Sequence, residues 1–198
     1  MIPDRLFSIM QCLECRSADL SYDTEKSKIL CRACNASFPD KEGIPSMMKG
    51  GPEEQDWNPW DLDKVKMMGN SYYKRAKGEL PEKEASKSCA RFLKQHGIYS
   101  SGDTLLDIGC AAGHFLVSFR RLLDENINYT GIDSGLEYLQ WGKEVYGLGD
   151  DRNFLHCDAL DMPFCDKSFD VVVVNLFHFF PRLDHALKEA MRVAGKMV

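Results

Sequence analysis

The stretch LLDIGCAAGHF, residues 105–115, decides how this chain is expected to fold. It begins as an apolar run typical of a buried parallel strand and continues into the apolar periodicity of a helix, with Phe115, Leu116 and Phe119 on one face. Between them lies a turn made almost entirely of very small residues, 109–113. A strand, a small-residue turn and a helix let a nucleotide-type cofactor lie against the main chain.

The pattern of the turn narrows the class of cofactor. A dinucleotide site of the form G-x-G-x-x-G would need glycines at positions 111 and 114, which hold Ala111 and His114. A phosphate-binding loop would need Lys-Ser or Lys-Thr after the turn, and neither pair occurs there. What remains is D-x-G-x-A-x-G from Asp107 to Gly113, in which an acid precedes the turn and suits a cofactor with a cationic amino group.

This pattern resembles the acidic-glycine motif of class I S-adenosylmethionine (SAM) methyltransferases, and three later segments agree with it in order and spacing. NYTGIDSG is a second short strand, FLHCDALDMPF resembles the third strand and its loop, and KSFDVVVV is a near-continuous β-branched strand. The resemblance covers residues 103–198 and implies a Rossmann-like α/β sheet. It also implies that Asp133 accepts the ribose hydroxyls and that Asp158 with the Ala159 backbone recognises adenine. The full set of implied cofactor-binding residues is Asp107, Gly109, Cys110, Ala111, Gly113, Asp133, Ser134, Asp158, Ala159 and Asn175.

Four of the eight cysteines stand in the first fifty residues as C-x2-C-x15-C-x2-C: Cys12, Cys15, Cys31 and Cys34. Two tight turns with this spacing can complete the sulfur tetrahedron that Zn²⁺ prefers. With the FP and GIP pieces that follow, residues 9–48 resemble the zinc ribbons of methyltransferase activators and of rRNA guanine-N1 methyltransferases. The alternative is four structural or redox cysteines without a metal.

The composition divides the chain into three parts: a zinc ribbon at 1–50, a linker and helical segment at 51–84, and a SAM-binding domain at 85–198. Helices are expected over KVKMMGNSYYKRAKGEL and PEKEASKSCARFLKQHGI, the second with Ala85, Cys89, Phe92 and Leu93 on its packed face. The resemblance implies seven strands, yet the chain reaches only the fourth before RVAGKMV. We therefore expect a partner protein or a missing C-terminal segment to cover an open sheet edge.

The composition argues against two kinds of partner: extended nucleic acid held by bulk charge, and a membrane. The formal net charge is −5, so no large cationic surface is available to bind extended nucleic acid. No apolar run approaches the roughly 20 residues needed to span a bilayer, and the N-terminus lacks a secretory pattern, which predicts a cytoplasmic protein without membrane contact.

The expected function is methyl transfer from SAM to RNA, protein or a small molecule. His178 is the candidate general base if the acceptor must lose a proton, although it could equally pack or hydrogen-bond at the edge of the site. The competing hypothesis is a non-catalytic docking or activating subunit that keeps a degenerate methyltransferase fold.

Overall fold

The computed structural model describes residues 4–49, 62–174 and 182–195. The first of these ranges, called the N-terminal unit below, contains one short helix and two hairpins. Its elements are α1 (Asp4–Ser8), β1 (Leu20–Asp23), β2 (Lys28–Cys31), β3 (Ser37–Lys41) and β4 (Ile44–Met47). The sequence predicted the first hairpin; the second, formed by the FP and GIP pieces, was not expected.

The remainder of the chain alternates helices and parallel strands, as predicted for the Rossmann-like fold. Its elements are α2 (Leu62–Ala76), α3 (Glu84–Gln95), β5 (Thr104–Ile108), α4 (Leu116–Leu122), β6 (Asn128–Asp133), α5 (Leu136–Tyr146), β7 (Arg152–Cys157), β8 (Val171–Val174) and α6 (Leu183–Val193). Each predicted strand from 103 onward is present among the described residues, so the fold class is confirmed.

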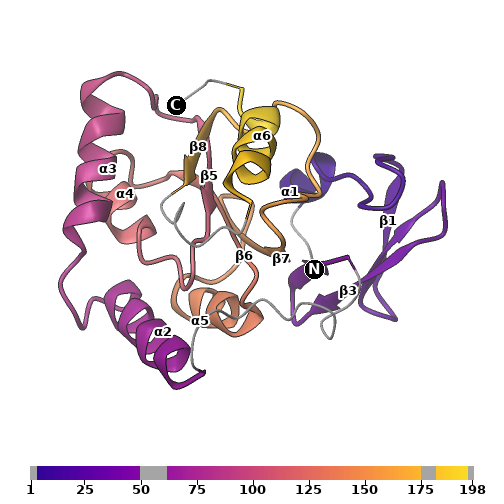
Figure 1. Cartoon of the computed structure of the whole chain (residues 1–198), viewed down its shortest axis with the longest axis horizontal. Helices are drawn as coiled ribbons and strands as arrows, with labels where there is room; N and C mark the ends of the chain where they lie inside the picture. Colours follow the sequence, from indigo (N-terminus) through magenta and orange to yellow (C-terminus); the bar gives the residue numbers. More distant parts are fainter. Residues whose placement is uncertain (1–3, 50–61, 175–181, 196–198) are drawn as a thin grey trace.

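All eight strands form one sheet in the order β1-β2-β3-β4-β7-β6-β5-β8. The strands of the N-terminal unit are antiparallel to one another, whereas β4 pairs in parallel with β7 through Ser46–His156 and Met47–Cys157. Figure 1 shows β1 and β3 continuing the sheet away from β7. The N-terminal unit is thus joined to the parallel strands by backbone hydrogen bonds, a contact that the sequence did not predict.

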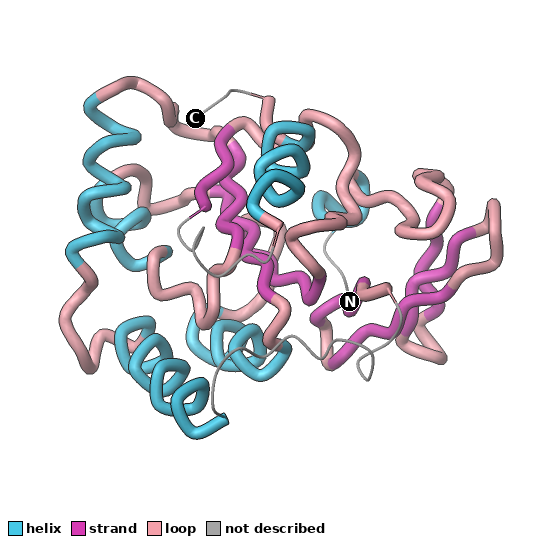
Figure 2. Tube along the Cα trace, viewed as in Figure 1, coloured by secondary structure: helices cyan, strands magenta, loops and turns pink. Residues whose placement is uncertain are grey.

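The two faces of the parallel sheet are buried by different elements, because neighbouring residues of a strand point to opposite sides. Leu105, Phe154 and Val171 pack with the helices α3, α4 and α5. Leu106 and Leu155 pack on the other face, with α6 and with the N-terminal unit, including its helix α1. Figure 2 shows the strands enclosed between these helices. The continuous apolar runs in the sequence therefore reflect burial on both faces.

The helix α3 forms where it was expected, and the prediction of its packed face was right for Leu93 and the partly buried Cys89 but wrong for Ala85 and Phe92. Its buried residues are Ser86, Ala90 and Leu93, while Ala85 is exposed and Phe92 is 49% exposed, beside the ring of His96. The reason is the contact with α4, where the Ser86 and Ser118 hydroxyls lie 2.8 Å apart. A polar pair thus occupies the interface that an apolar pattern could not identify.

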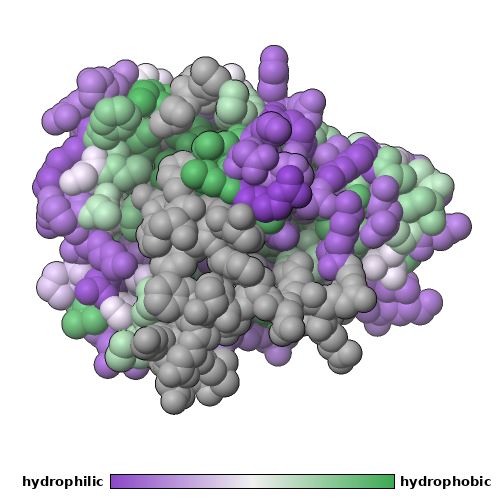
Figure 3. All heavy atoms as spheres, in the orientation of Figure 1, coloured by the Kyte–Doolittle hydropathy of each residue, from purple (hydrophilic) through white to green (hydrophobic). Residues whose placement is uncertain are grey.

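The edge of the sheet beyond β8 has no strand along it within the described residues. An isolated parallel bridge joins Phe169 to Ala194 there. Nearby, α6 exposes three apolar side chains at a spacing of four residues: Leu183, Leu187 and Met191. Apolar side chains gather between the hydrophilic surfaces over α3 and α6 (Figure 3). In the described ranges, no helix is both long and apolar enough to cross a membrane.

Candidate functional site

The small-residue loop after β5 is held in an uncommon backbone conformation. Gly109, Ala111 and Gly113 have φ values of 75°, 49° and 70°. Such positive angles favour glycine and are rare for a residue with a side chain. The amides of Gly109 and Cys110 donate to the carbonyl of Ile132 at 2.9 and 3.0 Å, which ties the loop to the end of β6. The loop conformation therefore depends on the neighbouring strand.

Asp133, the last residue of β6, holds this loop through both carboxylate oxygens. Oδ2 accepts from the Ala111 amide and Oδ1 from the Gly135 amide, each at 2.8 Å. Burial raises the pKa of Asp133, while the two amide hydrogen bonds oppose that rise. The half-buried side chain thus lies between the loop and the start of α5 and ties the two together.

Asp107 lies beneath the loop. Its side chain is only 2% exposed, and it accepts a hydrogen bond from the Tyr129 hydroxyl at 2.8 Å. Gly131 makes room for this arrangement, because a Cβ there would lie 2.7 Å from the Cys110 sulfur. Asp107 therefore supports the loop from below, and its contact with the cofactor stays a prediction.

We expect Asp107→Asn to alter how stability depends on pH. Burial raises the pKa of Asp107 to about 7, from an ordinary value of 3.8. The unfolded chain therefore releases this proton at a lower pH than the folded chain, and the contribution of Asp107 to wild-type stability falls as pH rises from about 4 to 7. Urea unfolding of both proteins across this range should show the difference between them shifting steadily in favour of the variant. Parallel stability curves would contradict this assignment.

The turn after β7 carries the predicted adenine-binding pair. Asp158 and Ala159 are half-buried, and the Asp158 carboxylate accepts from the Leu160 amide at 2.8 Å. The carbonyl of Asp158 accepts from the Asp161 amide at 3.2 Å, which closes the turn. Because β5, β6 and β7 are adjacent and parallel, this turn, Asp133 and Gly109 meet at the carboxyl ends of the strands. That edge of a parallel sheet is where ligands bind in such folds.

The loop itself is covered by aromatic side chains of α2 and α5. Tyr72 of α2 stacks on His114 with ring centroids 4.4 Å apart, and Tyr138 and Trp141 of α5 pack beside it. Residues 110–114 are buried as a result. The accessible part of the site is therefore the set Gly109, Asp133, Ser134, Asp158 and Ala159, all half-buried or exposed.

Two cationic side chains adjoin this aromatic cover. The Lys83 ammonium lies 4.2 Å from the centre of the Tyr72 ring, and Arg75 donates to Ser71 from the same helix as Tyr72. Arg75 also has a buried Nε without a hydrogen-bond partner. Within the described ranges, neither cation forms an ion pair. Both positions lie in the segment taken from sequence as a linker and helix, so no pattern identified them.

The four predicted metal ligands come together in the N-terminal unit. The sulfurs of Cys12, Cys15, Cys31 and Cys34 all lie within 4.8 Å of one another. The Cys12–Cys34 and Cys15–Cys31 sulfur separations are each 3.6 Å. Thiolates at about 2.3 Å from a tetrahedral Zn²⁺ would be roughly 3.8 Å apart, so the cluster fits a single ion.

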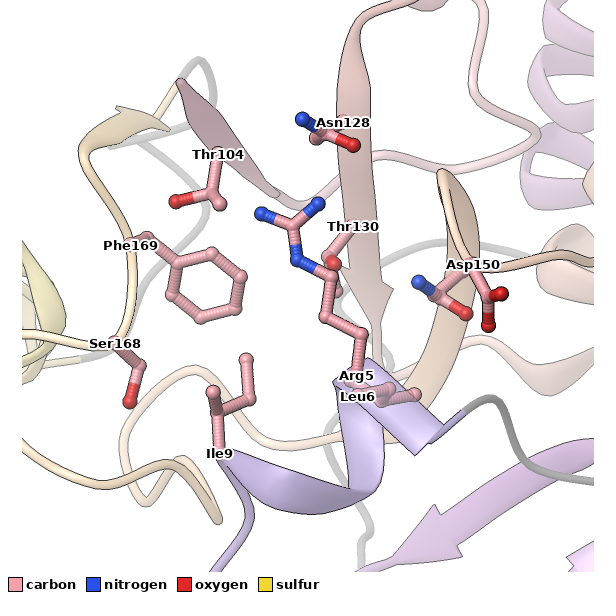
Figure 4. A pocket seen from close by; sticks show the side chains of 10 residues that line it. Arg5, Leu6, Ile9, Thr104, Asn128, Thr130, Asp150, Ser168 and Phe169 are labelled. Atoms are coloured by element: carbon pink, nitrogen blue, oxygen red, sulfur yellow. The ribbon is translucent and has the colours of Figure 1, made fainter. Parts of the chain in front are cut away.

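Two predicted residues, Asn175 and His178, lie outside the described residues. A separate cavity of about 20 Å³ lies near the amino ends of β5, β6 and β7, where Thr104, Asn128 and Asn153 line it (Figure 4). The side chain of Arg5 points into it, and the buried Oδ1 of Asn153 has no hydrogen-bond partner there. The cavity is large enough for a water molecule and too small for a cofactor.

Comparison with known proteins agrees with this geometry. Residues 105–196 match the family model described as a methyltransferase domain. A curated relative, the demethylmenaquinone methyltransferase of Staphylococcus aureus, is 32% identical over 104 residues, which are 52% of this chain and 43% of the relative. The chain thus spans less than half the length of the curated relatives it matches.

Solved structures show the same fold. A putative S-adenosyl-L-methionine-dependent methyltransferase from Methanococcus maripaludis aligns with a TM-score of 0.50 and 15% identity, over 67% of this chain and 57% of that chain. A chain from the complex between the Haloferax volcanii Trm112 methyltransferase activator and a putative methyltransferase is 26% identical over 63% of this chain and 53% of that chain, with a TM-score of 0.45. Residues 105–196 of this chain are thus similar to methyltransferase domains.

Proposed function

We propose that this chain transfers a methyl group from SAM to an acceptor. The observation that carries the proposal is the meeting of Gly109, Asp133 and Asp158 at the carboxyl ends of three adjacent parallel strands, within a matched methyltransferase domain. Bound SAM would supply an electrophilic methyl group on a positively charged sulfur. The protein's own task is to hold and orient the two reactants and to exclude water.

Each part of the site has a proposed role toward SAM. The Asp133 carboxylate accepts from the ribose hydroxyls, and Asp158 with the Ala159 backbone contacts adenine. Ser134 and Gly109 border the ribose. Cys110, Ala111 and Gly113 are buried beneath the aromatic cover in this structure, so their proposed contact with the sulfur end requires Tyr72 to move aside when SAM binds. Arg75 and Lys83 are cations without an ion-pair partner in the described ranges, which suits the carboxylate of the methionine part.

The acceptor classes that we propose to test are RNA, protein and small molecules. Demethylmenaquinone is included among them because a curated relative of this domain is named for it. His178 is proposed as the general base for an acceptor that must lose a proton, with Asn175 lining the same side of the site. The free edge of β8 is the proposed place for a protein partner or a further segment of chain.

We further propose that Cys12, Cys15, Cys31 and Cys34 bind one Zn²⁺. The support is the closeness of the four sulfurs and their fit to a tetrahedron. The ion would hold together a unit whose strands have four or five residues each and a correspondingly small core. Residues 1–50 as the ribbon, 51–84 as connector and 85–198 as the SAM-binding part remain the proposed division of the chain, and a cytoplasmic location remains a prediction.

The deciding experiment is incubation of the purified chain with methyl-labelled SAM and separate pools of RNA, protein and small molecules. We expect label to enter one pool, and we expect isothermal calorimetry to detect binding of the demethylated product, S-adenosylhomocysteine. Asp151→Asn, a change just before the amino end of β7, is the matched control for substitutions of Asp133 and should bind and transfer label as the wild type does. A well-folded sample that neither binds this product nor transfers label would defeat the proposal.

A further inference from the structure

Two cationic side chains of the N-terminal unit contact the turn from Asp158 to Met162, which carries the proposed adenine contacts and is called the adenine turn below. Arg16, which follows Cys15 directly, donates from Nη2 to the Asp161 carboxylate and from Nη1 to the Met162 carbonyl at 3.2 Å. Lys49, just after β4, places its Nζ 2.6 Å from the other oxygen of Asp161. Asp161 closes the turn that begins at Asp158, so both cations act on the backbone that carries the proposed adenine contacts.

A second connection runs from β4 to the residue after Asp133. The Ser46 hydroxyl lies 2.7 Å from Nδ1 of His156, and Nε2 of His156 lies 3.0 Å from the Ser134 carbonyl. A carbonyl can only accept, so Nε2 carries the proton and Nδ1 accepts from Ser46. Burial lowers the pKa of His156, which favours this neutral form. The imidazole thus joins the N-terminal unit to the proposed ribose segment.

The segment just before Cys12 holds the far side of the same turn. The Gln11 amide donates to the Pro163 carbonyl, and the Cys165 amide donates to the Ile9 carbonyl, both at 2.9 Å. These bonds run along an antiparallel bridge between Met10 and Phe164. These contacts attach the C-terminal end of the turn to the N-terminal unit, and at its other end Cys157 pairs with Met47 of β4.

From these contacts we infer that zinc binding by the N-terminal unit sets the affinity of the site for SAM, with Arg16 and His156 as the positioning residues. The inference rests on the proposed function and on the proposed Zn²⁺. Without the metal, the turn from Cys12 to Cys15 has nothing to fix it, and Arg16 is its direct continuation. Loss of the Arg16 contacts would loosen the adenine turn. Loss of the β4–β7 pairing would leave His156 without its hydrogen bond to Ser46.

The test is calorimetric titration of the zinc-loaded full chain with S-adenosylhomocysteine. We expect Arg16→Ala and Ser46→Ala each to weaken binding about tenfold, because the first removes one of the two cations on Asp161 and the second leaves the buried Nδ1 of His156 without its donor. Arg32→Ala is the matched control, since Arg32 lies between the cysteines of the second pair and its side chain, within the described residues, forms an ion pair with the exposed Asp19 at 3.6 Å. Zinc content should remain about one per chain in all three variants.

Metal removal provides the second arm. Chelated wild-type protein should bind S-adenosylhomocysteine more weakly than zinc-loaded protein, and chelation should weaken Arg16→Ala by a smaller factor because part of the coupling is already gone. If both variants, or the chelated wild type, bind as tightly as zinc-loaded wild type, the inference fails while the proposed function stands. If zinc-loaded wild type itself does not bind, the proposed function fails instead. Should Arg16→Ala not fold, Ser46→Ala decides the matter.

Discussion

Replacing Cys31 by Ser is expected to abolish zinc binding and to unfold the hairpins of the N-terminal unit. Cys31 is buried at the end of β2, and its sulfur lies 3.6 Å from that of Cys15. Three remaining thiolates cannot complete the tetrahedron, and a structural zinc site contributes on the order of 10 kcal/mol to folding. Elemental analysis should show zinc falling from about one per chain to near zero, and limited proteolysis should cut within residues 12–47.

The matched control is Cys89→Ser, which makes the same chemical change at a half-buried thiol of α3, outside the cluster. It should retain its zinc and its resistance to proteolysis. The Cys31 variant should also self-associate, because loss of β4 would expose the edge of β7 as an unpaired strand. A Cys31→Ser protein that is folded, monomeric and protease-resistant without zinc would contradict the metal assignment.

The parallel half of the fold was predictable because its signals are local. The small-residue turn at 109–113 and the β-branched run at Val171–Val174 each report burial and backbone approach within a few residues. The four cysteines were predictable for the same reason, since their spacing alone brings pairs of sulfurs together. In each case the physical cause lies within one short segment of chain.

The features that the sequence did not reveal depend on contacts between distant segments. Nothing in GIPSM marks β4 as a strand that pairs with β7, about 110 residues later. Likewise, nothing in the sequence pairs Asp107 with the hydroxyl of Tyr129, 22 residues later. The burial of Ala111 and Ala112 under Tyr72 follows from how α2 docks on α5, and that docking is a tertiary property.

Asp133→Ala is expected to weaken binding of S-adenosylhomocysteine roughly 10- to 100-fold, through lost hydrogen bonds to a charged group. The structure adds a second reason. The carboxylate supports Ala111, a non-glycine residue with a φ of 49°, through its amide, so the loop loses the bond that holds this conformation. We therefore expect a lower thermal midpoint together with the lower affinity, and calorimetry on the folded protein separates the two effects.

Asp133→Asn is the sharper variant, because it keeps the size of the side chain and removes only one acceptor. Wild-type Asp133 receives a backbone amide on each oxygen. An asparagine must turn its NH₂ group toward one of those N–H donors, so it can satisfy Ala111 or Gly135 but not both. It should fold with a smaller loss of stability than Asp133→Ala and still bind S-adenosylhomocysteine at least several-fold more weakly than wild type. Undiminished affinity in both folded variants would show that the ribose does not rest on this carboxylate, and the cofactor would then have to lie elsewhere along the carboxyl ends of the strands.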